Sequence, residues 1–144
     1  MTRIPSATRD SVPADQKNIF DEMMCARAER GAIGPDSIMI NVPVVLKRGQ
    51  HLREYLANES SLSPKIRELA MLVTARELDA PFIWHYHAPL GRNSGLRDAT
   101  VDNLRDNKEL TNIPADETAV VNYGREFFRS HRVTQHTFDA ALDH

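Results

Sequence analysis

The sequence predicts an all-α fold, a single-domain helical bundle of six to seven helices. Apolar residues recur at intervals of three and four in several successive segments, as they do in amphipathic helices. Proline stands at the start of several of these segments, and glycine follows the end of two of them. No segment has an alternation of apolar and polar residues long enough to indicate a strand. We therefore expect helices joined by short connections around one apolar core.

The N-terminal part begins with a polar segment followed by a helix. Residues 1–13 contain two prolines and few apolar residues, which predicts a flexible N-terminal arm. The helical domain then spans residues 14–144. Its first helix is predicted from Ala14 to about Arg30, and Gly31 ends it.

A turn and a second helix are predicted before residue 60. Residues 34–36, Gly-Pro-Asp, are typical of a turn. Pro43 is a suitable first residue for the second helix, and Gly49 weakens its middle. Its apolar residues are Val44, Val45, Leu52, Tyr55 and Leu56.

The segment from Ser63 to Asp79 is the most apolar helical run. Ser63 can cap the helix, and Pro64 at the first helical position loses no hydrogen bond. Apolar residues cover two faces, which indicates a central, buried helix. Glu68 has apolar residues three, four and seven positions further on, so its carboxyl group lies along an apolar stripe.

A second helical arm is predicted from Pro81 to Gly95, so that the two arms form a hairpin. It carries Phe82, Ile83, Trp84, His85, Tyr86 and His87 in succession. Pro89 cannot donate a hydrogen bond to the carbonyl of His85, which predicts an interruption and a kink beside the histidines.

Three further helices are predicted in the C-terminal part. They span Asp98 to Asp106, Pro114 to about His131, and Thr134 to the end of the sequence. Residues 107–112 are predicted as a loop.

The amino-acid composition argues against some classes of binding partner. The 144 residues include 18 basic and 20 acidic side chains, and no basic stripe is present, which argues against nucleic acid. No apolar run is long enough to span a membrane. One cysteine, Cys25, permits no internal disulfide, and the first 20 residues lack a signal-peptide pattern. These features predict a cytoplasmic protein.

The hairpin resembles the carboxymuconolactone decarboxylase-like family, which includes the alkylhydroperoxidase D proteins. The resemblance rests mainly on Arg67-Glu68-Leu69-Ala70 in the first arm and on Trp84-x-x-His87 followed by Gly95 in the second. Asn41-Val42-Pro43 and Leu52-Arg53 resemble the family's preceding helix, so the similarity covers about residues 41–142. It implies an alkylhydroperoxidase D-like helical fold, a homo-oligomer and a small-molecule substrate.

The peroxidase branch of that family fits poorly. Its motif, Glu-x11-Cys-x2-Cys-x3-His, matches Glu68 and His87 but places its two cysteines at Ala80 and Ile83. Thiol peroxidase chemistry requires a sulfur nucleophile at that place, and Cys25 lies outside the motif. A peroxidase-like oxidoreductase is therefore the least favoured alternative.

The decarboxylase branch requires no cysteine and, by resemblance, no metal or organic cofactor. A lactone whose carboxylate is conjugated to the ring carbonyl loses CO2 to leave a dienolate, which the enzyme must stabilise and protonate on carbon. By resemblance, Glu68 and His87 are the catalytic residues and form a proton relay, in which His87 supplies the proton either in its cationic form or relayed through Glu68. Arg67, Lys65 or Arg92 can hold the substrate carboxylate, and Trp84 and His85 complete the candidate substrate-binding set.

The expected helix geometry and several alternative roles leave the function of Glu68 and His87 open. Counting from a turn at residues 78–81, Glu68 and His87 lie roughly 6 Å apart along the helix axes, which predicts a water between them rather than direct contact. Glu68 can instead pair with Lys65 or with an arginine of a neighbouring helix in a structural role. A metal bound by His85 and His87 is disfavoured, because residues two apart on a helix point to nearly opposite sides.

A non-catalytic binding protein on the same fold is the main alternative function. It would keep the acid and the histidine for structural reasons. The family commonly has another apolar helix after the position of His144, so we expect an apolar patch that oligomer contacts cover.

Overall fold

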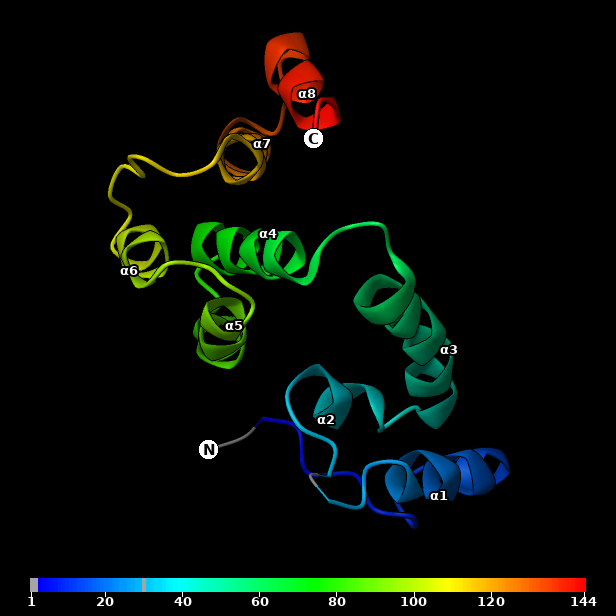
Figure 1. The fold of residues 1–144 in the computed structure, drawn as a ribbon. Coiled ribbons are helices and arrows are strands. Elements are labelled where there is room, and N and C mark those ends of the chain that lie inside the picture. Colours follow the sequence, from blue (N-terminus) through cyan, green and yellow to red (C-terminus); the bar gives the residue numbers. More distant parts are fainter. Residues whose placement is uncertain (1–2, 30) are drawn as a thin grey trace. The chain divides into compact units, whose positions relative to one another are not determined.

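The computed structural model describes residues 3–29 and 31–144, and this part of the chain contains helices but no strand (Figure 1). The all-α prediction is confirmed. Eight α-helices occur in the described residues, one more than the upper number predicted. Residues 1, 2 and 30, where the predicted arm begins and the first predicted helix ends, lie outside the described residues. The chain divides into two compact units, Met1–Ser61 and Leu62–His144. The single helical domain of residues 14–144 stays a prediction.

The first unit consists of three α-helices and two short irregular turns of helix. These are η1 (Ala14–Gln16), α1 (Lys17–Cys25), α2 (Pro35–Met39), α3 (Pro43–Glu54) and the π-helical turn η2 (Tyr55–Glu59). Helix α3 contacts both α1 and α2. The buried apolar side chains between them are Val12, Phe20, Met23, Ile40 and Leu46. Val12 belongs to the segment predicted as an arm, and its side chain is part of this core.

The predicted turn at residues 34–36 is wrong, because a short helix begins there. Gly34 has φ 54°, a conformation that glycine adopts readily, and it leads directly into α2 with Pro35 at the first helical position. The Ser37 hydroxyl donates a 2.7 Å hydrogen bond to the Gly34 carbonyl. One turn of helix was too short to produce a recognisable apolar period in the sequence.

A buried ionic cluster joins the elements of the first unit. The side chains of Arg27 and Asp36 are 6% and 8% exposed, and Arg27 Nε donates a 2.8 Å hydrogen bond to Asp36 Oδ2. Arg53 of α3 donates to the other carboxylate oxygen, Oδ1. Arg27 also donates to the carbonyl of Met23, at 3.0 Å, just before the end of α1. Both oxygens of the buried acid are therefore satisfied.

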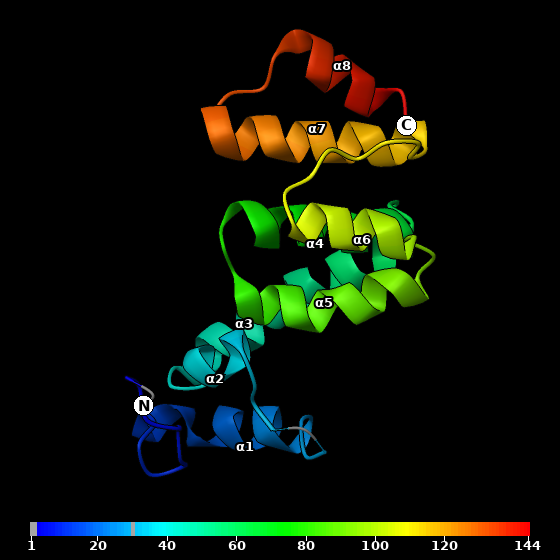
Figure 2. The same cartoon turned by 90° about the vertical axis from the view of Figure 1, so that its left-hand side faces the viewer.

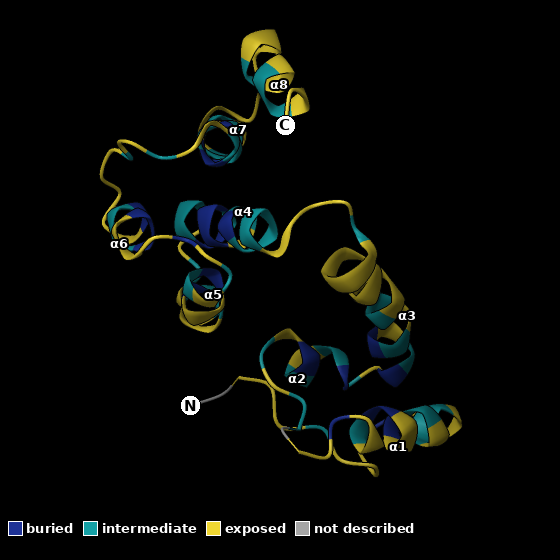
Figure 3. Ribbon diagram, viewed as in Figure 1, coloured by how far each residue is buried: buried dark blue, intermediate teal, exposed yellow. Residues whose placement is uncertain are grey.

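The second unit is built around α4 (Pro64–Glu77). Helices α5 (Pro81–Asn93), α6 (Asp98–Arg105) and α7 (Ala115–Ser130) all contact α4, and α8 (Gln135–Leu142) packs on α7 (Figure 2). The buried side chains of this core are Leu69, Leu72, Val73, Ala88, Leu96, Val101, Leu104 and Val121. The middle of α4 is largely buried (Figure 3), with Leu69, Leu72, Val73 and Ala75 enclosed. Met71 and Leu78 are exposed, so one of the two predicted apolar faces is buried only in part.

Helices α4 and α7 run parallel and are joined by charged residues at both ends. Lys65 Nζ donates to Glu117 Oε1 at 3.0 Å, and Arg129 donates to both Glu77 oxygens at 2.6 and 2.7 Å. Each pair is 52 residues apart in the chain, which fixes the register of the two helices. Between them Gly124 permits close approach, since a Cβ atom there would lie 2.5 Å from Val73 Cγ1.

None of the helices that the structure describes has both the length and the apolar composition of a membrane span.

Candidate functional site

The candidate site lies on the hairpin formed by α4 and α5. The Ser63 hydroxyl caps α4 by accepting a 3.3 Å hydrogen bond from the Ile66 N–H, as predicted. A tight turn with Asp79 at φ 48° reverses the chain, and Pro81 begins α5. The hairpin is therefore specified by local signals at the start of each helix.

Glu68 and His87 meet directly across this hairpin. His87 Nδ1 lies 2.8 Å from Glu68 Oε2, and the two side chains are 17% and 12% exposed. The predicted bridging water is wrong, because the two side chains together span the offset along the helix axes once the helices lie close enough. Glu68 does not pair with Lys65, whose ammonium group binds Asp116 and Glu117 at 3.3 and 3.0 Å.

Gly91, one turn after His87, accounts for the close approach of the helices. A Cβ atom at Gly91 would lie 2.9 Å from Leu96 Cδ1, 3.2 Å from Leu72 Cδ1 and 3.7 Å from Glu68 Cβ. A side chain at this position would therefore have to displace Leu96 and Leu72 beside the pair. Gly91 was not predicted as a site residue, although a glycine in the middle of a helix is a signal for close packing.

The contact fixes the tautomer and orientation of the imidazole. A carboxylate accepts the Nδ1 proton, so the neutral ring keeps its lone pair on Nε2 and the protonated ring carries a second N–H there. Among the described residues, no protein group forms a hydrogen bond with His87 Nε2. This nitrogen can thus accept or donate a proton while Glu68 holds the ring.

Aromatic and imidazole neighbours surround His87 on α5. The Tyr86 ring lies edge-on to the imidazole with centroids 5.2 Å apart. Trp84 is partly buried and packs against the core of the second unit. His85 is exposed. The described residues contain no group of three or more His, Cys, Asp or Glu side chains arranged to hold a metal ion.

Helix α5 passes through Pro89 without a break. One helix extends from Pro81 to Asn93, so the predicted interruption is wrong. Because proline has no N–H, the carbonyl of His85 lacks its helical donor at this point. His85 lies in the exposed part of the helix, where water can supply that hydrogen bond.

The basic candidates for binding a substrate carboxylate differ in what they already contact. Arg92 donates to Asp98 and Asp102 at 2.8 and 2.9 Å, which ties α5 to α6. The hydrogen bond to Glu117 raises the pKa of Lys65 although burial acts in the opposite direction, and its ammonium group is engaged by two acids. Arg67, next to Glu68, is half-buried and forms no ion pair with any residue that the structure describes.

Comparison of the chain with protein-family models, curated proteins and solved structures finds no match. The support for a function therefore comes from the residues of this chain and from the geometry of the hairpin.

Proposed function

We propose that the chain is a cofactor-independent carboxy-lyase that acts on a small carboxylated lactone such as 4-carboxymuconolactone. The observation that supports this most directly is the 2.8 Å contact between His87 Nδ1 and Glu68 Oε2, which leaves Nε2 without a protein partner in the described structure. A largely shielded carboxylate that orients an imidazole is a common arrangement for proton transfer. The resemblance of the hairpin to the carboxymuconolactone decarboxylase-like family agrees with this proposal.

The proposed reaction needs one electron sink and one proton. The bond between the ring carbon and the carboxylate breaks, CO2 leaves, and the electron pair moves through the double bond onto the lactone carbonyl as a dienolate. Protonated His87 then gives its Nε2 proton to carbon, and the neutral imidazole regains a proton from water. Glu68 stabilises the cationic ring before the transfer and keeps its orientation afterwards.

Arg67 is the preferred candidate for holding the substrate carboxylate. It precedes Glu68 on α4, and it is the member of the three basic candidates with no acidic partner in the described residues. A guanidinium group binds a carboxylate through two parallel hydrogen bonds, which would fix the lactone relative to the imidazole. Trp84 and His85 remain secondary candidates, because one packs on the core and the other is exposed.

The proposal includes a homo-oligomer. Phe82, Tyr86 and Leu90 are spaced four residues apart on α5 and are 49%, 43% and 38% exposed. An exposed apolar row of this kind is typical of an interaction surface. Light scattering with the variant Phe82→Ser tests this part, and a wild-type protein that is monomeric at all concentrations contradicts it.

The test is release of CO2 from 4-carboxymuconolactone by wild-type protein and by the variants His87→Gln, Glu68→Gln and His51→Gln. We expect turnover by wild type and by His51→Gln, which changes an exposed histidine outside the hairpin, and a loss of about 10²- to 10⁴-fold in His87→Gln. Circular dichroism confirms that each variant is folded. Folded wild-type protein that releases no CO2 contradicts the assignment and favours a non-catalytic binding protein, in which the same contact only joins two helices.

A further inference from the structure

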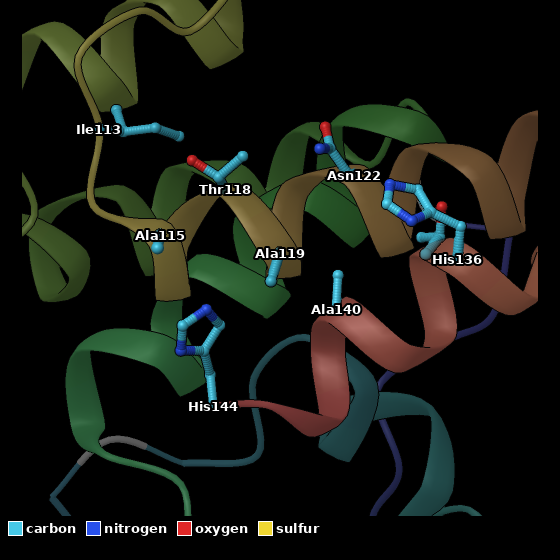
Figure 4. Close-up of a pocket in the computed structure, with 9 residues that line it drawn as sticks. Ile113, Ala115, Thr118, Ala119, Asn122, His136, Ala140 and His144 are labelled. Carbon is cyan, nitrogen blue, oxygen red and sulfur yellow. The ribbon is translucent and has the colours of Figure 1, made fainter.

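A groove between α7 and α8 lies apart from the Glu68–His87 pair. It has a volume of about 470 Å³, and none of its lining residues belongs to α4 or α5 (Figure 4). A volume of this order falls within the range of small-molecule sites in proteins, about 300–1,000 Å³. The lining residues are Ile113, Ala115, Thr118, Ala119, Asn122, His136, Thr137, Ala140 and His144.

Small apolar side chains create the space along the middle of the groove. Ala115 and Ala119 face it from α7, and Ala140 faces it from α8 (Figure 4). The two helices are held by a defined connection, because Thr134 caps α8 and its backbone N–H donates to Glu126 at 3.1 Å. The groove therefore follows from alanines at positions where larger residues would fill the contact between the helices.

Polar side chains surround the apolar middle of the groove. Figure 4 shows His144 toward one end and His136 toward the other, with Asn122 beside His136. In the described part of the chain, the side chains of these three residues make no hydrogen bonds with protein groups. Imidazole and amide groups each donate and accept, so they match ligand groups that also do both, such as hydroxyl and amide groups.

The lining of the groove favours an uncharged ligand. None of the described residues that line it is Asp, Glu, Lys or Arg. A strongly charged ligand would therefore give up hydration without gaining an ion pair from these side chains.

We propose that this groove binds an uncharged, elongated small molecule with an apolar centre and hydroxyl or amide groups at its ends. The alanines contact the centre, and His136, Asn122 and His144 bind the ends. The site is separate from the proposed lyase chemistry and does not depend on it.

Three compounds with one para-substituted benzene skeleton test the ligand class. They are 1,4-benzenedimethanol, which is neutral, terephthalate, a dianion, and 1,4-xylylenediamine, a dication. Amide spectra of the ¹⁵N-labelled full chain are recorded during titration with each. We expect saturable shifts at Ala115, Ala119 and Ala140 with the neutral compound and about tenfold weaker binding of the other two. Equal binding of all three, or shifts outside the groove, overturns the proposal.

Substitutions of groove residues test where the ligand binds. Ala140→Leu fills the groove from the partly buried face of α8 and should abolish the shifts, whereas His136→Ala and Asn122→Ala should weaken binding about fivefold each. Both latter residues are exposed, so their variants keep the fold even if Ala140→Leu does not. His51→Gln, on α3, is the matched control and should bind as wild type does. Unchanged affinity in His136→Ala and Asn122→Ala overturns the assignment of the ends.

Discussion

The two units each contain a shielded carboxylate that binds a basic side chain from another element, and the two sites differ in what that base can do. Asp36 binds two arginines, and both of its oxygens are engaged. Glu68 binds one histidine through one oxygen. A guanidinium group keeps its proton throughout the physiological range, whereas imidazole side chains exchange theirs near neutral pH.

This difference indicates which buried acid can take part in chemistry. Burial alone would raise the pKa of Asp36, but the hydrogen bonds and charges of Arg27 and Arg53 outweigh it and hold the pKa below its usual range. Asp36 is thus fixed as an anion in a structural cluster. Glu68 instead orients a group with a free second nitrogen. The ability of the partner to release a proton, rather than burial of the acid, separates the two sites.

The largest expected effect on stability comes from breaking the arginine cluster. Asp36→Ala leaves the buried Arg27 guanidinium without its counter-charge, which should cost about 3–5 kcal/mol in the first unit. Hydrogen exchange of the α1 and α3 amides measures this loss locally. The double variant Asp36→Leu with Arg27→Met removes both charges and should recover much of the stability. A single variant as stable as wild type would show that the cluster is not structural.

Acid should weaken the same cluster partially. The pKa of Asp36 is lowered in the folded protein, so the unfolded chain binds the proton more readily. The contribution of Asp36 to the free energy of unfolding is therefore fully present above an ordinary carboxyl pKa of about 3.9, and it decreases as the pH falls below that value. Urea unfolding curves at a series of pH values measure this slope. Asp36→Asn should have a flatter dependence than wild type, and identical slopes would contradict the assignment.

A smaller effect is expected where α5 approaches α4. Gly91→Ala places a methyl group against Leu96 and Leu72, which should cost about 1–3 kcal/mol by overpacking and regain up to about 1 kcal/mol in helix propensity. It should also lower the rate of CO2 release by moving His87 away from Glu68. Gly49→Ala is the matched control, because its methyl group meets only Met39 Sδ at 4.0 Å and should stabilise α3. Full activity in Gly91→Ala would remove Gly91 from the positioning of the pair.

The smallest effect on stability is expected at Glu68 itself. Glu68→Gln keeps the size of the side chain and should reduce the free energy of unfolding by only about 1 kcal/mol, the usual net value of one hydrogen bond. Its rate of CO2 release should nevertheless fall steeply. A variant that loses several kcal/mol of stability would place Glu68 with Asp36 as a structural acid.

Local sequence signals predicted most of the helices. The features that the sequence did not predict depend on contacts between helices. Ser63, Pro64 and Pro81 mark helix starts that the structure confirms. The pairing of Asp36 with Arg27 and Arg53 depends on how α2 and α3 fold back, which no local pattern reports.

The candidate site was predicted in part. Glu68 and His87 were both identified, but their direct contact depends on Gly91 and the packing distance that it permits. The groove residues His136 and Asn122 lie on two helices whose spacing was not predictable, so they were not recognised.

Chemical rescue of His87→Ala tests directly whether His87 transfers the proton. The variant removes the imidazole while Glu68 remains, and added imidazole can occupy the space and carry the same proton. We predict that CO2 release from 4-carboxymuconolactone is lost in His87→Ala and partly restored by imidazole, but not when Glu68→Gln is also present. Release at the wild-type rate by His87→Ala without imidazole would contradict proton transfer by His87.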